Sequence, residues 1–468
     1  MRWLLAIALT IVSVGATPRH PDELALEPID FTSPQAVEAQ LSSGIPVYIF
    51  ENHDLPLVSI DIRFRMGRRY LDPEEFAAIG LLGRLWDTGG AGNLSPEALE
   101  ERLAALDVTI SAWVSNRSGS VSAFMVREDL REAISLWRDV LLEPRLDKER
   151  LKRSQAQALK DVQRINNNPD AIADQRFYRL LYGEEFPGVQ LDTRASIEDV
   201  ARDDLIRLHR RFVHPDNAII GVSGDVGQHE ILTLLDEVLA GWGEDVRFEP
   251  PSQAEWTPHP RPGVYVLTGD YEQSQVRIGR LIPHLTRTSP DYPISRILDF
   301  ALGWGRVFYR SRAEGISYGA AVRVEAGEER ATLNGFGSTG AGTTVDLLRL
   351  LIEEVDRMES EPFSVEEIET SRSFMIGTEI SRSETARGII GRKLEAITLG
   401  RPDDYIEVQL DGLKAADAAM ASSFVDRYVH SDEPLVVFAL GDPEKFGASL
   451  EDLGQGDVVE LEPIIFGE

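Results

Sequence analysis

The sequence predicts an α+β protein built from two copies of one domain, each an antiparallel-rich mixed sheet with helices on one face. Three observations predict this. Residues 47–50 (VYIF) return as residues 264–267 (VYVL), an offset of 264 − 47 = 217 residues. Residues 211–216 (RFVHPD) return as 427–432 (RYVHSD), and each copy then runs through an apolar stretch to Gly-Asp. Strand-like and helix-like segments also follow one another in the same order in both halves, which is typical of α+β domains. The period is far longer than that of solenoid repeats, so two domains are expected.

The elements of the first copy follow from their periodicity. Residues 46–50 and 57–64 predict paired strands, because the second alternates Ile60, Ile62 and Phe64 at period two. Residues 74–86 predict a helix and residues 97–106 a second one. Strands are expected at 108–114 and 118–126, and helices at 128–142 and 148–166.

The second copy repeats this pattern. Strands are expected at 264–268, 275–281, 316–325 and 330–337, with a helix beginning at residue 294 and another over 344–358. After Pro362, Ser364 and Glu367 have the spacing of a capping box, which predicts the start of a further helix.

The N-terminus has the pattern of a signal peptide over residues 1–16. Arg2 precedes thirteen largely apolar residues, and residues 14–16 (VGA) have the small side chains that signal peptidase accepts. This stretch is shorter than the roughly 20 residues of a membrane span. We therefore expect an exported chain, periplasmic or secreted, without a membrane anchor. The Pro/Gly-rich stretch 241–262 indicates a domain boundary. It predicts domains at 17–245 and 263–468 joined by a linker at 246–262.

Composition excludes several classes of function. With 48 basic and 78 acidic residues the formal charge is −30, which argues against nucleic-acid binding. The absence of cysteine excludes disulfides, thiolate metal sites and a cysteine nucleophile. His209 and His214 cannot share a helix face as metal ligands, so we expect one surface residue and one at a strand entry. Residues 335–340 (GFGSTG) match a dinucleotide-binding pattern, but no strand with an acidic end follows them, so we expect a bent edge strand instead.

The sequence resembles the pitrilysin/insulinase-type zinc peptidases, which include the mitochondrial processing peptidases. The resemblance covers nearly the whole mature chain. It rests on the strand at 46–49, the helix opening Gly80-Leu81-Leu82, the run 207–225, and residues 305–308, Arg312 and 315–318 of the second copy. It implies a clamshell of duplicated α+β domains and an inverted zinc motif, H-x-x-E-H, on the first long helix.

The sequence departs from that motif. Alignment on Gly80-Leu81-Leu82 puts Gly83, Trp86 and Asp87 where the first histidine, the general base and the second histidine are expected. Asp161, eight residues before Pro169, occupies the third ligand position. Zinc catalysis needs three protein ligands and an activated water, which these residues cannot supply. We therefore expect no catalytic residue and no metal in this chain.

Family members without the motif commonly pair with an active subunit and supply an arginine and a tyrosine that hold the peptide. The resemblance gives these roles to Arg312 and Tyr318, with Arg310 as the fallback because the spacing is one residue short. We therefore expect a non-catalytic subunit that pairs with an active zinc peptidase, as a heterodimer or higher assembly, and helps bind peptide substrates, with the zinc in the partner. Two alternatives stay open: a stand-alone peptidase with a divergent site, and a scaffold or peptide-binding protein without catalytic association.

Overall fold

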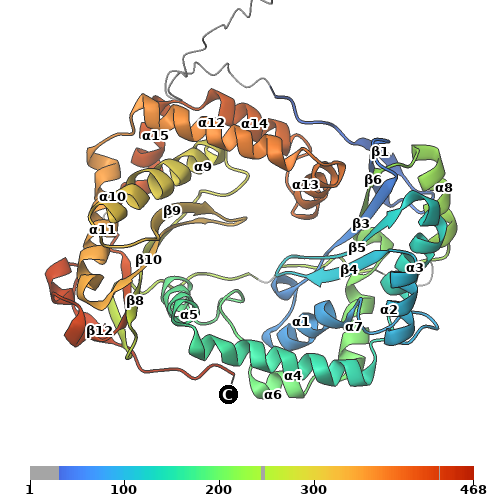
Figure 1. Cartoon of the computed structure of the whole chain (residues 1–468), viewed down its shortest axis with the longest axis horizontal. Helices are drawn as coiled ribbons and strands as arrows, with labels where there is room; N and C mark the ends of the chain where they lie inside the picture. Colours follow the sequence, from blue (N-terminus) through green and yellow to red (C-terminus); the bar gives the residue numbers. More distant parts are fainter. Residues whose placement is uncertain (1–30, 244–247, 254, 432, 468) are drawn as a thin grey trace, which may run out of the picture. The chain divides into compact units, whose positions relative to one another are not determined.

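Two six-stranded mixed sheets, one in each half of the sequence, organise the structure (Figure 1). The computed structural model describes residues 31–243, 248–253, 255–431 and 433–467. The first sheet has the strand order β1-β2-β6-β3-β5-β4 and the second has the order β12-β7-β11-β8-β10-β9. In both, the first strand of the repeat pairs in parallel with the last, β2 with β6 and β7 with β11, and the central pairs are antiparallel. The predicted fold class and duplication are confirmed.

The elements of the first half carry the core of the first sheet. The strands are β1 (Val37–Gln40), β2 (Pro46–Glu51), β3 (Leu57–Arg65), β4 (Thr109–Val114), β5 (Ser118–Val126) and β6 (Ala218–Gly224). The helices are α1 (Phe76–Leu85), α2 (Pro96–Ala105), α3 (Leu130–Leu142), α4 (Lys148–Arg164), α5 (Pro169–Tyr182), α6 (Arg194–Glu198), α7 (Arg202–Phe212) and α8 (Gln228–Val238). Alternate residues of β2 and β3 are buried against α1, α3, α7 and α8, as period-two patterning requires.

The second half repeats this arrangement. The strands are β7 (Gly263–Thr268), β8 (Gln273–Ile282), β9 (Ala320–Ala326), β10 (Ala331–Gly340), β11 (Val436–Gly441) and β12 (Val458–Glu460). The helices are α9 (Tyr292–Phe300), a π-helical segment η7 (Ala301–Val307), α10 (Phe308–Ala313), α11 (Thr344–Ser360), α12 (Val365–Arg382), α13 (Ala386–Thr398), α14 (Tyr405–Ala415) and α15 (Ala418–Phe424). The capping box at the start of α12 is confirmed, since Glu367 and Ser364 exchange both hydrogen bonds. The glycine pattern at 335–340 lies in β10, an inner strand between β8 and β9, so the expectation of an edge strand was wrong.

Each half contributes one helix, from an equivalent position of the repeat, to the sheet of the other half. On the face of the first sheet opposite its own helices, Ile390 and Leu394 of α13 pack on Tyr48 (Figure 1). On the corresponding face of the second sheet, Phe177 of α5 packs on Phe438. The helices begin at residues 169 and 386, which are 217 residues apart (386 − 169), the offset of the repeat. Each half therefore completes the core of the other.

The boundaries expected from composition stay predictions. Residues 33–468 form one compact unit by their contacts, and the expected linker at 246–262 is described except for residues 246, 247 and 254. The expected signal peptide at 1–16 lies outside the described residues. Among the helices that the structure describes, we found none long and apolar enough to span a bilayer.

Candidate functional site

The end of helix α1 holds the positions where the resembled motif has its zinc ligands and base, and here these positions are built into the core. Gly83 lies so close to β4 that a Cβ atom on it would sit 3.1 Å from the Val114 nitrogen and 3.2 Å from its Cβ. A side chain at this position would require its neighbours in β4 to shift by a few tenths of an ångström. The glycine is therefore explained by close helix–strand packing and supplies no metal ligand.

Trp86 and His209 together satisfy the C-terminal end of helix α3. The carbonyl of Val140 cannot receive the usual helical hydrogen bond, because residue 144 is proline and has no N–H. The Trp86 indole N–H donates to it at 3.1 Å, in a fully buried position. The next carbonyl, that of Leu141, accepts from the His209 Nε2 at 2.8 Å. The two rings meet edge to face, 5.4 Å between centroids, and form one structural unit.

His209 is consequently a neutral core histidine. Burial lowers its pKa to about 4, more than the hydrogen bond to the Leu141 carbonyl restores. The expectation that one of the pair His209 and His214 is a surface residue was wrong, since both are buried. The His209 ring faces inward toward the end of α3.

Asp87 fixes an edge strand. Its Oδ2 accepts a hydrogen bond from the Ala112 amide of β4 at 3.0 Å, and burial raises the pKa of this carboxyl. In the second half, Asp299 accepts from the Val324 amide of edge strand β9 at 3.1 Å. Both pairs are related by the same offset of 212 residues (299 − 87 and 324 − 112). Because the second copy uses an aspartate in the same way, the Asp87 carboxylate is best explained as a cap on the edge strand.

Asp161, on α4, is also engaged. Its carboxylate pairs with Arg84 at 2.9 Å and accepts from the Gln157 amide at 2.7 Å. Burial alone would raise the pKa of Asp161, but the hydrogen bonds from Gln157 and Arg84 lower it below its ordinary value. Glycine offers no donor atom, the indole N–H only donates, and the two carboxylates are occupied, so this set does not fit Zn²⁺. Across the described ranges, no group of three His, Cys, Asp or Glu side chains could hold a metal ion.

Arg312 and Tyr318 lie together on the surface of the second half. The Arg312 Nε and Nη2 donate to the Tyr318 carbonyl at 3.1 and 3.0 Å, and the guanidinium lies 4.1 Å from the Phe308 ring centroid. Tyr318 is 88% exposed. It precedes β9, which begins at Ala320, so the expectation of a strand over 316–325 placed it inside a strand incorrectly.

The fallback residue Arg310 points elsewhere. Its guanidinium pairs with Glu314, Glu353 and the fully buried Glu354, at 2.8, 2.6 and 3.0 Å. Glu353 and Glu354 hold it against α11. Of the two arginines that the sequence left open, Arg312 is therefore the one beside Tyr318.

Comparisons with known proteins identify similar sequences and folds. The family model described as "Peptidase M16 inactive domain" matches residues 199–375. The chain is 21% identical over 398 residues to the "Non-peptidase homolog YmxG" of Helicobacter pylori, covering 83% of this chain and 90% of that protein. A crystal structure of a peptidase M16 inactive domain from Pseudomonas fluorescens aligns with a TM-score of 0.75 at 17% identity, covering 87% of this chain and 98% of that one. The chain is therefore similar in sequence and fold to proteins of the M16 peptidase family.

A second protein of similar structure is longer than this chain. The periplasmic protease PqqL from Escherichia coli aligns with a TM-score of 0.77 at 13% identity, covering 94% of this chain and 49% of that chain. The resemblance to zinc peptidases of the pitrilysin/insulinase type is therefore confirmed. Gly83, Trp86 and Asp87 lie outside the matched range 199–375, so their structural roles rest on the contacts described above.

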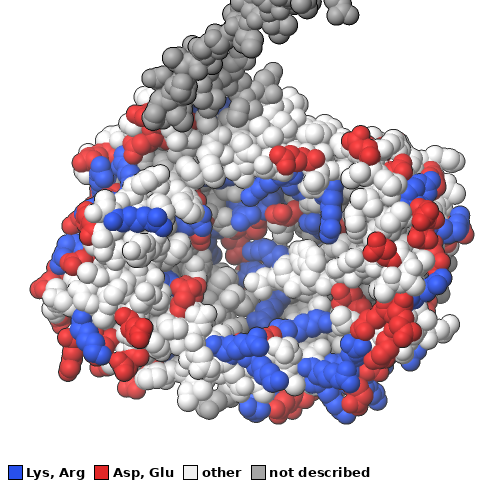
Figure 2. All heavy atoms as spheres, viewed as in Figure 1, with Lys and Arg blue, Asp and Glu red and all other residues white. Residues whose placement is uncertain are grey.

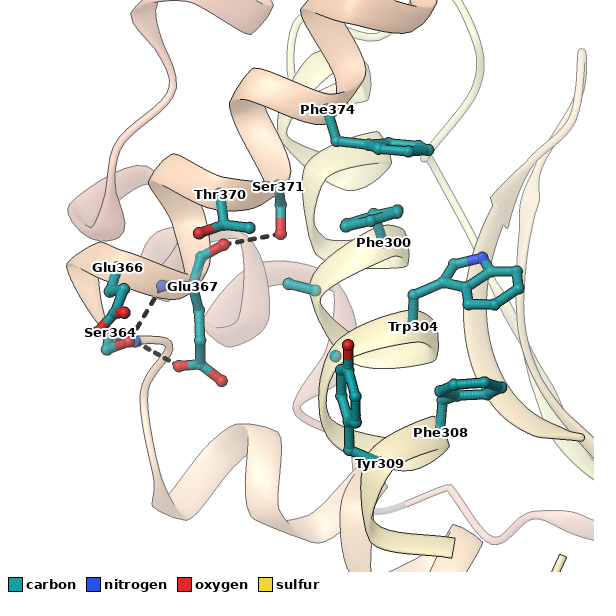
Figure 3. Close-up of a pocket in the computed structure, with 12 residues that line it drawn as sticks. Phe300, Trp304, Phe308, Tyr309, Ser364, Glu366, Glu367, Thr370, Ser371 and Phe374 are labelled. Carbon is teal, nitrogen blue, oxygen red and sulfur yellow. Dashed lines mark hydrogen bonds between the residues drawn. The ribbon is translucent and has the colours of Figure 1, made fainter. Parts of the chain in front are cut away.

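An aromatic pocket adjoins Arg312, and the sequence did not predict it. The pocket, about 540 Å³, lies between the continuous helical segment α9–η7–α10 and helix α12. Figure 3 shows Phe300, Trp304 and Phe308 projecting from one side of that segment. The Phe374 ring stacks on Phe300 from α12, 4.0 Å between centroids. Phe308 contacts both the pocket and the Arg312 guanidinium, so pocket and arginine form one surface.

Spacing in the sequence could have indicated this pocket only in part. Phe300, Trp304 and Phe308 recur every four residues, which by itself predicts a buried helix stripe. In the structure this stripe is not fully buried, since Trp304, within the π-helical segment, is 53% exposed. Such wide turns are frequent at functional sites.

Proposed function

We propose that this chain is an exported, non-catalytic subunit that pairs with an active zinc peptidase of the M16 family and helps hold its peptide substrates. One observation carries the proposal. The positions of the zinc motif, Gly83, Trp86 and Asp87, are committed to packing and hydrogen bonding, whereas Arg312 and Tyr318 stay exposed beside a pocket. The zinc and the general base would come from the partner.

The chemistry of Arg312 and Tyr318 suits a peptide backbone. Two of the Arg312 nitrogens donate to the Tyr318 carbonyl, while Nη1 has no hydrogen-bond partner among the residues that the structure describes. Its N–H groups, together with the Tyr318 hydroxyl, can donate to a peptide carbonyl or a terminal carboxylate. The guanidinium is held by the carbonyl and by the Phe308 ring, so little side-chain freedom is lost on binding.

The aromatic pocket supplies a place for a substrate side chain. Its walls are apolar rings, and Gly305 forms part of its lining without a side chain. A Cβ on Gly305 would meet no atom within 4 Å, so this position is open space. Pockets of about 300–1,000 Å³ with apolar walls and few polar groups are the usual form of small-ligand sites.

Pairing and export have separate support. PqqL, a protease chain of which this chain covers 49%, contains a region of this fold in about half of its length. A two-chain assembly would provide the remaining half as a separate subunit. The pattern of residues 1–16 supports export, and PqqL is described as periplasmic.

The experiment is reconstitution. The chain is tagged and purified from its native organism, co-purifying proteins are identified, and any partner with H-x-x-E-H is expressed for recombination. We expect Arg312→Ala and Tyr318→Phe to leave assembly intact and to lower kcat/KM of the pair roughly 10–150-fold, the range for lost charge-assisted hydrogen bonds of about 1.5–3 kcal/mol. Arg349→Ala, an exposed arginine of α11, is the matched control.

The other outcomes are distinct. Peptide hydrolysis by the chain alone would support the stand-alone peptidase with a divergent site. Peptide binding without any co-purifying M16 subunit would support the scaffold or peptide-binding protein. Normal activity of both variants in a correctly assembled pair would remove Arg312 and Tyr318 from substrate binding.

A further inference from the structure

A second cavity, about 730 Å³ in volume, is lined by positive charge. It lies among α5, α9, α12 and the β9–β10 hairpin, and its lining includes five arginines but only two carboxylates, Asp299 and Glu325. The arginines are residues 287, 296, 323, 330 and 382. Figure 2 shows basic side chains gathered around the hollow of the viewed face. This balance is the reverse of the whole chain, which carries a formal charge of −30.

Strand register explains how arginines from distant positions meet here. In the β9–β10 hairpin, Arg323 lies opposite Asn334 and Glu325 lies opposite Thr332. Residues 330, 332 and 334 follow one another at period two, so Arg330 belongs to the same face. That face meets helix α5 of the first half, where the Tyr178 hydroxyl accepts a hydrogen bond from the Asn334 amide at 3.0 Å. The helix exchanged between the halves therefore forms one wall of the cavity.

The carboxylates near the cavity do not balance its arginines. Arg296 is paired with the buried Glu379 at 2.6 Å. The same carboxylate is only 3.5 Å from Arg382 and also binds Arg392 at 2.5 Å, so one negative charge faces three guanidinium groups. The Glu379 carboxylate is therefore occupied by Arg296 and Arg392, its closer and more buried partners. The Arg382 side chain stays 58% exposed.

The hairpin arginines are less constrained. Arg323 lies 3.5 Å from both Asp299 and Glu325, outside the range of a good hydrogen bond. Burial raises the pKa of Asp299 to about 6. The Arg330 guanidinium lies 5.3 Å from the Trp256 ring centroid, and it has no ion pair within the described part of the chain.

We propose that this cavity binds an acidic peptide segment, with Arg323, Arg330 and Arg382 as the carboxylate-binding residues. A guanidinium offers a planar pair of donors that matches a carboxylate, and it stays charged at any physiological pH. The Debye length at physiological ionic strength is about 8 Å, so more distant acidic residues are screened. The arginines of its walls therefore determine the electrostatic potential inside the cavity.

The cavity is suited to peptide rather than to a single small anion. Its volume is larger than the aromatic pocket, and Phe374 lines both. A chain held by Arg312 and Tyr318 could thus continue past Phe374 to the arginines. The proposal rests on the proposed function, because it names acidic peptides as the substrate class of the same surface.

The test uses the full mature chain without any partner, so that its outcome is independent of subunit pairing. Binding of fluorescein-labelled decapeptides is measured by anisotropy, comparing a glutamate-rich peptide with its glutamine counterpart and a lysine-rich one. We expect the glutamate peptide to bind at least about tenfold more tightly than the glutamine peptide, with affinity falling as salt rises. Arg323→Gln and Arg330→Gln should each weaken binding of the glutamate peptide about tenfold, the low end for hydrogen bonds to charged groups.

Controls separate the possible results. Arg349→Gln, outside the cavity on α11, should leave binding unchanged, and Arg330→Lys should retain part of it because the charge is kept. Equal binding of the glutamate and glutamine peptides, or full binding by Arg323→Gln and Arg330→Gln, would overturn the proposal. Competition by citrate at the same concentration as the peptide would also overturn it, since the site would then be one for small polycarboxylates. Acidic-peptide binding without a co-purifying peptidase would leave this inference standing and refute only the pairing.

Discussion

Replacement of Trp86 by phenylalanine tests whether the position expected for the general base is structural in this chain. The change removes the indole N–H that serves the Val140 carbonyl, which Pro144 leaves without a helical donor. A buried acceptor left without a partner costs about 1–3 kcal/mol. The smaller ring leaves a void beside Phe64 and His209, which adds on the order of 1 kcal/mol. The free energy of unfolding should therefore fall by about 2–4 kcal/mol.

Urea unfolding followed by tryptophan fluorescence and circular dichroism measures this loss. Trp113→Phe is the matched control, because Trp113 is 39% exposed on edge strand β4 and should change stability by less than about 0.5 kcal/mol. A Trp86→Phe protein as stable as the unmodified chain would refute the reasoning. The end of α3 would then be held by other contacts, and position 86 would be free for a function that the packing does not explain.

Three further predictions follow from the same contacts. His209 has a pKa of about 4 in the folded state, against an ordinary value of 6.5, so the unfolded chain binds more protons between these pH values. Acidification from pH 6.5 to 4 should therefore lower the free energy of unfolding by about 3 kcal/mol. Urea titrations of His209→Gln should show a pH dependence reduced by that amount. Gly221→Ala would place a Cβ 2.3 Å from the Ile390 Cγ2 and should lower the free energy of unfolding by about 1–3 kcal/mol, because it displaces α13. The control Gly80→Ala, with no atom within 4 Å, should be neutral or stabilising by up to about 1 kcal/mol. Equal urea midpoints for the two variants would contradict the packing of α13 on the first sheet. Because positions 83, 86 and 87 do not fit a zinc site, EDTA treatment followed by dialysis should leave the thermal midpoint of the purified chain unchanged, and a midpoint lowered by the chelator would show a structural metal.

Local sequence patterns identified most elements and the duplication, because each depends on neighbouring residues. The period-two run of β3 and the capping box of Ser364 with Glu367 are determined within a few positions. The departure from the zinc motif at Gly83, Trp86 and Asp87 could also be predicted from the sequence, because alignment on the adjacent helix opening is enough to find it. The contacts that explain these residues could not be predicted from the sequence, because Pro144 and His209 are far from Trp86 along the chain.

Features that depend on the meeting of distant segments could not be predicted. The apolar stripe of α13 shows that the helix is buried on one side, but not that it packs on the sheet of the other half. The arginine cavity combines residues from a loop, α9, the β9–β10 hairpin and α12 with tyrosines of α5. In the sequence these arginines are scattered among acidic residues and predict only a solvated surface.

The most direct test of the account is purification of the tagged chain from its native organism, with zinc content, peptidase activity and co-purifying proteins measured on the same sample. The account predicts a stoichiometric M16 partner with an intact H-x-x-E-H motif, zinc in proportion to that partner, and chelator-sensitive activity that is lost when the two chains are separated. A chain that purifies alone with about one zinc per molecule and cleaves peptides would contradict it.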